Sequence, residues 1–394
     1  MDTPKKKARG RSTTGASPVV PVASRRIKPL AQLRLFVRAG GRCEFDGCNK
    51  YLLEHPLTLT PGNFAQMAHV VAFKKDGPRG SGPRPKDIND VGNLMLLCPA
   101  CHKLIDSDPE KFPVAVLEKY KEKHEERIKH VTGLGPDLKT SVVQLKAKIA
   151  GQVVAIPAAH VTTAIAPRYP VALPGHLIDL TGIEGEGEAF FAAAAETIKR
   201  RVEGICAQGA DIHETRHISL FALAPIPLLI RLGRELGNKI AMDVYQRHRD
   251  TEAWAWKDCG EPVDYRVEKL REGSDARQVA LVLSLSGKVP LDVLPREIDA
   301  RFTVYELTLE GIEPAPMYLR VREDLERFKH AYQILLRKIA HDHGPIEALH
   351  LFPAVPAPIA VLCGRELLPK VDPTLVVYDY DKHNDGFLLA LKVN

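Results

Sequence analysis

The chain has 394 residues, of which 45% are hydrophobic and 26% are charged, and its formal net charge at pH 7 is +6. At roughly 150 residues per domain, this length predicts two or three domains and excludes a single small module or a disordered chain. No stretch approaches the roughly 20 uninterrupted apolar residues of a membrane-spanning helix, and the N-terminus lacks the apolar core of a secretory signal, so we expect a cytoplasmic protein.

The positive charge is concentrated in the first third of the chain. Residues 1–135 contain 24 Lys and Arg against 14 Asp and Glu, whereas residues 136–394 contain 31 against 35. Residues 1–28 are basic, rich in Ser, Thr, Gly and Pro, and without hydrophobic periodicity, which predicts a disordered arm. This arm fits a solubilising tail as well as a DNA contact. The first third is the part that we expect to meet a polyanion.

One domain is expected over residues 29–135. The spacing of apolar residues predicts a helix over 30–39, and the Gly, Pro and charged residues of 73–91 predict a loop. A charged helix over about 113–130 is expected to close this domain. Because residues 136–175 contain several prolines, we expect a linker there.

The remainder, residues 176–394, contains an internal repeat. The sequence FALAPIPLLIRLGREL, which starts at Phe221, returns as FPAVPAPIAVLCGREL at Phe352, with seven ungapped identities. The flanking strand-like and helix-like segments also repeat, which predicts two βαβαβ units and therefore two Rossmann-like halves, at about 176–290 and 291–394. Ligands of such sheets bind beyond the carboxyl ends of the strands, where the repeated Pro225 and Pro356 turns are expected.

Four of the seven cysteines form two close pairs, Cys43 with Cys48 and Cys98 with Cys101. In a chain without a signal peptide, two such pairs indicate a zinc site rather than disulfides. The separation of the pairs is too long for a simple zinc finger. We therefore expect the metal to close the base of a larger unit, with Zn–S bonds of about 2.3 Å.

Several further residues in this region suit catalysis. His69 and Asn93 lie between the cysteine pairs, and His102 and Asp106 follow the second pair at a spacing of four residues. In a helix that spacing places both side chains on one face, one turn apart. An imidazole nitrogen and a carboxylate oxygen suit Mg²⁺, Mn²⁺ or a similar cation, although an isolated pair of this kind is usually only a surface polar pair.

Together these residues resemble the HNH, or ββα-metal, nucleases, in the zinc-containing group that ends in NL-x-x-LC-x-x-CH. The matched residues are Cys43, Cys48, His69, Asn93, Cys98, Cys101 and His102. The resemblance implies phosphodiester hydrolysis by a zinc-stabilised α+β domain, in which His69 takes a proton from the attacking water and Asn93 orients His69 and its hairpin. It also implies a divalent cation, for which we choose His102 and Asp106 as ligands. Ala68 stands where many of these enzymes have a metal ligand.

The loop between His69 and Asn93 is basic. Its candidate DNA-binding residues are Lys74, Lys75, Arg79, Arg84 and Lys86. Contacts of such side chains with phosphates give affinity without sequence readout. Because no segment resembles a recognition helix, we expect cleavage of double-stranded DNA with little sequence preference.

Residues 160–394 resemble a SAVED domain, which is built from two fused CARF-like halves. The resemblance rests on the two repeat segments, on WAW at 254–256 and on LVLSLSG at 281–287. HNH–SAVED fusions resemble effectors of CBASS anti-phage defence. What this implies is a sensor for a cyclic oligonucleotide, with a cyclic dinucleotide such as a cGAMP isomer favoured. Binding would assemble a homo-oligomer, a dimer or a tetramer, and activate DNA degradation as abortive infection.

Candidate residues for this messenger are aromatic side chains that stack on bases, and cations or helix N-termini that bind phosphates. They are Pro225, Arg247, His248, Trp254, Trp256, Lys199, Arg200, Pro356, Tyr378 and Tyr380. Because Trp254 and Trp256 alternate, one is expected to face a core and the other a surface or the ligand.

Two other interpretations of the sequence remain. In the first, the front module is a zinc-stabilised DNA-binding unit without catalysis, and the protein is a ligand-responsive regulator. In the second, the protein is a restriction-type nuclease whose back half recognises modified DNA. The net negative charge of residues 136–394 argues mildly against this second alternative, because DNA readers are usually basic.

Overall fold

The computed structural model describes residues 26–149, 151–207, 211–368 and 370–394. The chain divides into two compact units, Met1–Leu134 and Gly135–Asn394. Most of the basic arm predicted over residues 1–28 lies outside the described residues, which begin shortly before the buried Ile27. Within the described ranges, no helix combines the length and the apolar character that a bilayer span requires.

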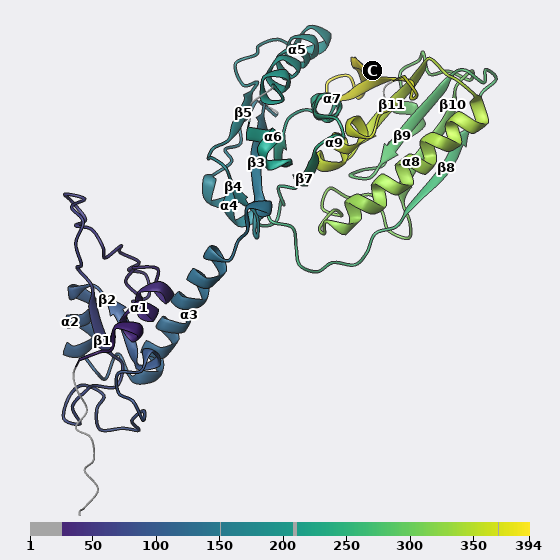
Figure 1. Cartoon of the computed structure of the whole chain (residues 1–394). Coiled ribbons are helices and arrows are strands. Elements are labelled where there is room, and N and C mark those ends of the chain that lie inside the picture. The colour runs from purple at the N-terminus through teal and green to yellow at the C-terminus, as the bar shows by residue number, and fades with distance from the viewer. Residues whose placement is uncertain (1–25, 150, 208–210, 369) are drawn as a thin grey trace, which may run out of the picture. The chain divides into compact units, whose positions relative to one another are not determined.

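The first unit consists of a short antiparallel hairpin surrounded by helices (Figure 1). Its elements are α1 (Pro29–Arg38), β1 (Gln66–His69), η1 (Val91–Asn93), β2 (Leu94–Leu97), α2 (Pro99–Ser107) and α3 (Val114–Thr132). The helices predicted over 30–39 and 113–130 are therefore confirmed as α1 and α3. In the hairpin, His69 at the end of β1 pairs with Leu94 at the start of β2.

The core of this unit depends on one strand. All four residues of β2 are buried, whereas β1 buries only Ala68. Pro99 stands at the first turn of α2, where a missing N–H costs nothing, and Cys98 caps that helix. A core of this size benefits from an additional cross-link, which the cysteine pairs are placed to provide.

The second unit contains two sheets joined by helices (Figure 1). The first sheet and its helices comprise η2 (Pro136–Leu138), β3 (Lys139–Lys146), α4 (Ala158–Ile165), β4 (Tyr169–Pro170), β5 (His176–Asp179), α5 (Gly187–Ile205), α6 (Asp211–Thr215), β6 (His217–Leu223), α7 (Ile226–Leu236) and β7 (Ala241–Tyr245). The second comprises β8 (Tyr265–Arg271), β9 (Val279–Ser284), η3 (Leu291–Val293), β10 (Thr303–Leu309), α8 (Glu323–His343), β11 (Ala348–Ala354), α9 (Ala357–Arg365), β12 (Thr374–Asp381) and β13 (Gly386–Val393).

Both sheets contain four parallel strands in the same arrangement. In the first sheet β3 lies between β5 and β6, and β7 follows β6; in the second, β9 lies between β10 and β11, and β12 follows β11. The antiparallel strands β8 and β13 extend the second sheet at its two edges. The predicted pair of Rossmann-like halves is therefore present, with each half built on four parallel strands.

The predicted boundaries of these halves are wrong in two places. Residues 136–175 are not a linker, because β3 within this range is a central strand of the first sheet. Strand β9, which we assigned to the first half, pairs with β10 and β11 of the second. Parallel strands pair across long stretches of chain, so the sequence near the repeat could not show which earlier strand joins it.

The repeated glycines lie where the two halves touch. Helices α7 and α9 lie between the sheets (Figure 1), and they cross at Gly233 and Gly364. A Cβ atom on Gly233 would stand 1.9 Å from the carbonyl oxygen of Val361, and a Cβ on Gly364 would stand 1.8 Å from that of Ile230. The contact is reciprocal under the repeat, so the glycines permit direct contact between two backbones.

Arg365 fastens the same interface. Its guanidinium donates hydrogen bonds from α9 to the carbonyl oxygens of Gly237, just after α7, and of Ile240, the latter at 2.5 Å. Carbonyls at the end of a helix lack partners within the helix, and a cation there also interacts favourably with the helix dipole. The repeated glycines and Arg365 thus lie at contacts between the halves.

Candidate functional site

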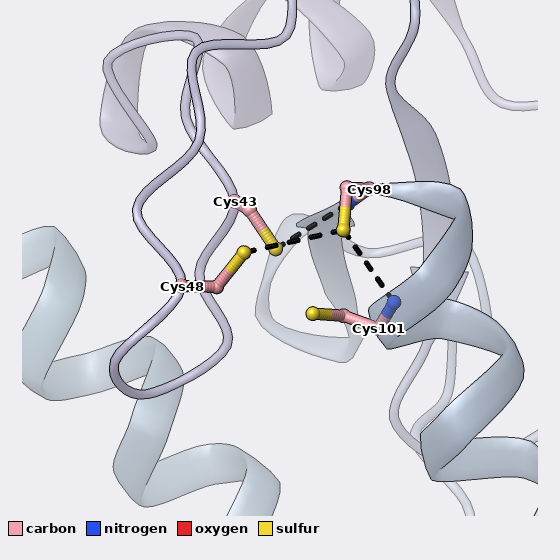
Figure 2. A group of neighbouring side chains, drawn as sticks. All are labelled: Cys43, Cys48, Cys98 and Cys101. Atoms are coloured by element: carbon pink, nitrogen blue, oxygen red, sulfur yellow. Dashed lines mark hydrogen bonds between the residues drawn. The ribbon is translucent and has the colours of Figure 1, made fainter.

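The four paired cysteines converge on one point in the first unit. Cys43 and Cys48 come from a loop, while Cys98 and Cys101 lie at the start of α2 (Figure 2). All four Sγ atoms lie within 4.8 Å of one another, and those of Cys48 and Cys98 are 4.0 Å apart. No disulfide links them, since all four are free cysteines.

This donor set fits a zinc ion. Bonds of about 2.3 Å in a tetrahedron place sulfur atoms roughly 4 Å apart, which agrees with the observed separation. Burial raises the pKa of Cys43 to about 12 and also raises that of Cys101. Although burial acts against it, hydrogen bonds from the Cys101 backbone and from neighbouring thiols hold the pKa of Cys98 below its ordinary value. Zinc binding would release the remaining thiol protons.

Glu44, which the sequence analysis missed, ties the cysteine loop to the hairpin. Its backbone N–H donates to the carbonyl of Leu96 at 2.9 Å, and its side-chain Oε2 accepts from the N–H of Leu96 at 2.5 Å. The carboxyl is fully buried, with Lys121 at 3.7 Å, and burial raises its pKa to about 7. The loop that carries Cys43 is therefore anchored on β2.

His69 is half-buried at the end of β1. Its Nε2 lies 2.9 Å from Oδ1 of Asn89, in the loop that precedes β2. The ring of Phe73 contacts the imidazole edge to face, with centroids 5.9 Å apart. Asn89 was not among the predicted residues. The only signal in the sequence was its place in the polar segment NDVGN, and nothing there distinguishes it from Asn93.

Asn93 holds the backbone rather than the imidazole. Its Oδ1 accepts from the N–H of Val71 at 2.8 Å, and its Nδ2 donates to the carbonyls of Val71 and Ile88 at 3.1 and 2.9 Å. These bonds join the chain just after His69 to the chain just before Asn89. Its buried amide braces both sides of the hairpin that carries His69, and the predicted role of Asn93 in orienting His69 stays a prediction.

The two residues predicted to bind the catalytic cation, His102 and Asp106, lie close together, but Asp106 also has another partner. Nε2 of His102 lies 3.4 Å from Oδ2 of Asp106, and Nδ1 of His102 lies 2.7 Å from Oε1 of Gln66 in β1. Oδ1 of Asp106 accepts from Arg79 at 2.8 Å. Among the described residues, the four cysteines are the only group of three or more His, Cys, Asp or Glu placed to hold one metal ion.

The basic loop divides into structural arginines and exposed lysines. Arg79 has a side chain only 4% exposed and donates to the carbonyls of Val70 and Ile105 as well as to Asp106. Arg84 donates to three loop carbonyls, those of Ala72, Phe73 and Gly80. The assignment of Arg79 as a DNA contact is therefore wrong, because its guanidinium is buried, whereas the half-buried Arg84 keeps that assignment as a prediction. Lys74, Lys75 and Lys86 are exposed and keep that assignment as a prediction.

In the second unit, one tryptophan is buried in the core and the other is partly exposed, as expected. Trp254 is 1% exposed and packs against Phe221, with centroids 5.3 Å apart, so its assignment to the ligand is wrong. Trp256 is half-buried and contacts the ring of the buried His248. Both the indole Nε1 of Trp256 and the Nε2 of His248 are buried and have no hydrogen-bond partner in the described part of the chain. A cavity of about 10 Å³, the size of one water molecule, adjoins His248.

The other predicted ligand residues are dispersed. Tyr378 is buried, stacks on Phe352 and bonds to His350 at 2.9 Å, which leaves no free ring face for a base. The remaining positions are the helix caps Pro225 and Pro356, the exposed Lys199 and Arg200 on α5, Arg247 in an ion pair with Glu252, and the exposed Tyr380. A cavity of about 640 Å³ lies elsewhere, between the ends of α8 and α9 and the starts of β11 and β12.

Two family models match the chain. Residues 43–108 match the model described as HNH endonuclease, and residues 198–393 match the SMODS-associated and fused to various effectors sensor domain, abbreviated SAVED. These matches confirm the predicted order of an HNH nuclease domain followed by a SAVED domain, and the four clustered cysteines agree with the zinc-containing form.

Solved structures similar to the chain include two bacterial receptors. The Acinetobacter baumannii Cap4 SAVED/CARF-domain containing receptor with the cyclic trinucleotide 3′3′3′-cAAA is 10% identical, with a TM-score of 0.45 over 74% of this chain and 62% of that one. The Moraxella osloensis Cap4 SAVED/CARF-domain containing receptor is 11% identical, with a TM-score of 0.37 over 74% and 60%. The chain thus spans less than two thirds of their length. No curated protein matches it.

Proposed function

We propose that this chain, which joins an HNH endonuclease domain to a SAVED sensor domain, is a DNA endonuclease switched on by a cyclic oligonucleotide. The observation that carries the proposal is the hairpin geometry. One half-buried imidazole, His69, ends β1 and lies opposite Leu94 at the start of β2, and a cluster of four thiols anchors the chain at the other end of β2. Such an imidazole suits general base catalysis near neutral pH.

His69 is the residue proposed to take the proton from a water molecule that attacks phosphorus. The exposed Lys74, Lys75 and Lys86, on the loop between β1 and β2, would bind backbone phosphates of the DNA without reading its sequence. Asn93 and Arg84 would keep the ends of that loop in place through their bonds to backbone carbonyls. The proposed substrate is double-stranded DNA.

Two kinds of metal ion belong to this proposal. The four cysteines would hold a structural Zn²⁺. His102 would offer its imidazole to a divalent cation such as Mg²⁺, with Asp106 as a weaker second ligand because Arg79 already neutralises it, and with water and phosphate in the other positions. A cation bound there would stabilise negative charge on the phosphate and the leaving 3′ oxygen.

The second unit is the proposed sensor. Two fused halves with parallel strands offer anion sites at the carboxyl ends of the strands, where α7 and α9 begin. We propose a cyclic dinucleotide as the messenger and ligand-induced oligomers as the active form. The resemblance to HNH–SAVED fusions supports a role of this activity in CBASS anti-phage defence.

The test is a plasmid assay with purified full-length protein, Mg²⁺ and a panel of cyclic di- and trinucleotides. The wild type is compared with His69→Ala and with His130→Ala, which removes an exposed histidine from α3 of the same unit. We expect one compound to activate the wild type and His130→Ala, and His69→Ala to be inert. The oligomer size should increase with the same compound, measured by light scattering.

Two outcomes would support the alternatives instead. DNA binding that responds to the compound without any strand cleavage would indicate a regulator. Cleavage of modified plasmid without any cyclic oligonucleotide would indicate a restriction-type nuclease. Equal cleavage by His69→Ala and the wild type would refute the assignment of His69.

A further inference from the structure

We propose that Asn89 is the positioning residue of the nuclease site, which holds the proton of His69 on Nε2 and leaves Nδ1 free to act as the base. This inference rests on the proposed nuclease function. It goes further because it assigns the reacting nitrogen and a residue that neither the family match nor the motif identifies.

The geometry defines the tautomer. Oδ1 of Asn89 lies 2.9 Å from Nε2 of His69. A carbonyl oxygen can only accept a hydrogen bond, so Nε2 must carry the proton, and the neutral imidazole then has its lone pair on Nδ1. A residue that fixes one imidazole nitrogen in this way determines which nitrogen is available for chemistry.

Neighbouring residues hold His69 and Asn89 in position relative to each other. Asn93 binds the backbone at Val71, two residues after His69, and at Ile88, the residue before Asn89. Phe73 packs edge to face against the imidazole and restricts its rotation. A single buried amide therefore sets the positions of both members of the pair, which explains how Asn93 can matter without touching His69.

The aspartates that flank Asn89 form hydrogen-bonded turns in this loop. The backbone N–H of Asn89 donates to Oδ1 of Asp87 at 3.0 Å, and Oδ1 of Asp90 accepts from the N–H of Gly92 at 2.8 Å. These two aspartates form the local turns of the loop.

The first experiment reads the tautomer without requiring activity. Full-length protein is labelled with ¹⁵N-histidine, and the His69 signals are assigned by comparison with His69→Ala. Two-bond ¹H–¹⁵N spectra above pH 8 should show the Nε2–H form for the wild type and a mixture for Asn89→Leu. An Nδ1–H form in the wild type would overturn the proposal, whatever the protein cleaves.

The second experiment uses plasmid cleavage under activating conditions. Asn89→Leu removes the acceptor and should lower kcat about 10- to 100-fold with KM for DNA unchanged. Asn89→Asp keeps an acceptor and adds a charge that stabilises the imidazolium, so the acid limb of its pH–rate profile should move up by about one pH unit. Asn63→Leu, which removes an acceptor that bonds only Ala65 in the described contacts, is the matched control.

The outcomes separate the two proposals. If the wild type cleaves no DNA with any compound, the proposed function fails and the tautomer measurement still decides the role of Asn89. If the wild type is active and Asn89→Leu matches it, the positioning role is refuted. Loss of zinc in Asn89→Leu together with an unmoved pH profile in Asn89→Asp would show a structural role and would also refute it.

Discussion

The crossing of α7 and α9 makes a quantitative prediction about the sensor unit. In Gly364→Ala, the new Cβ would stand 1.8 Å from the carbonyl oxygen of Ile230, whereas real Cβ contacts are essentially never below 3.0 Å. The helices must therefore separate by more than 1 Å. That separation loses much of the attraction between the packed surfaces, at a cost of about 3 kcal/mol in the free energy of unfolding. For a unit of this size, Tm should fall by roughly 6–12 °C.

The assay follows tryptophan fluorescence on heating. The chain has two tryptophans, Trp254 and Trp256, and both lie in the second unit, so excitation of tryptophan reports the unfolding of that unit. Gly233→Ala should behave like Gly364→Ala, and the double variant should lose less than the sum because one methyl group already separates the helices.

Gly204→Ala is the matched control for this prediction. A Cβ on Gly204, inside α5, would meet nothing within 4 Å, so alanine there should be neutral or stabilise by up to about 1 kcal/mol. If Gly364→Ala unfolds at the same temperature as Gly204→Ala, the backbone contact between α7 and α9 does not exist as described.

The remaining predictions concern the metal site, the basic loop and one half-buried carboxyl. Cys48→Ser should lose zinc, measured by release to a chromogenic chelator, whereas Cys259→Ser, at an exposed cysteine outside the cluster, should retain it. Lys75→Ala should weaken DNA binding and lower the slope of log affinity against log salt concentration by about one. Arg79→Ala should instead lower the free energy of unfolding of the first unit by about 2–3 kcal/mol, measured by circular dichroism. Burial raises the pKa of Asp379 from 3.8 to about 6, so its ionisation destabilises the folded state as pH rises through this range. Asp379→Asn should therefore be more stable than the wild type at pH 7.5 by up to about 2 kcal/mol, and equally stable near pH 4. The same stability difference at both pH values would contradict this prediction.

Local chemistry could be read from the residues alone. The spacing of Cys98 and Cys101 and the earlier pair Cys43 and Cys48 predicted one metal site, because only a few arrangements use thiols at such intervals. The apolar spacing of α1 predicted a helix, and the repeat predicted two related halves. These features depend on residues that are close in the sequence or on two segments with identical residues, and both can be recognised in one sequence.

Contacts between segments that are distant in the sequence could not be predicted from the residues alone. Arg79 and Lys74 look alike in a basic loop, and only the fold turns one guanidinium inward to Asp106 and leaves the other cation in solvent. Asn89 and Asn93 stand four residues apart in one polar segment, yet one faces His69 and the other the backbone. No periodicity distinguishes such pairs, since the difference arises from where the loop returns to the hairpin.

From the sequence by itself came the cluster of four cysteines and the duplicated architecture, because these are properties of residue type, spacing and repetition. Tertiary structure alone decided that β3 and β9 are the first parallel strands of the two halves and that the repeated glycines form a contact between α7 and α9. Parallel pairing and backbone contact join segments separated by long stretches of chain, and their partners are selected by packing in three dimensions.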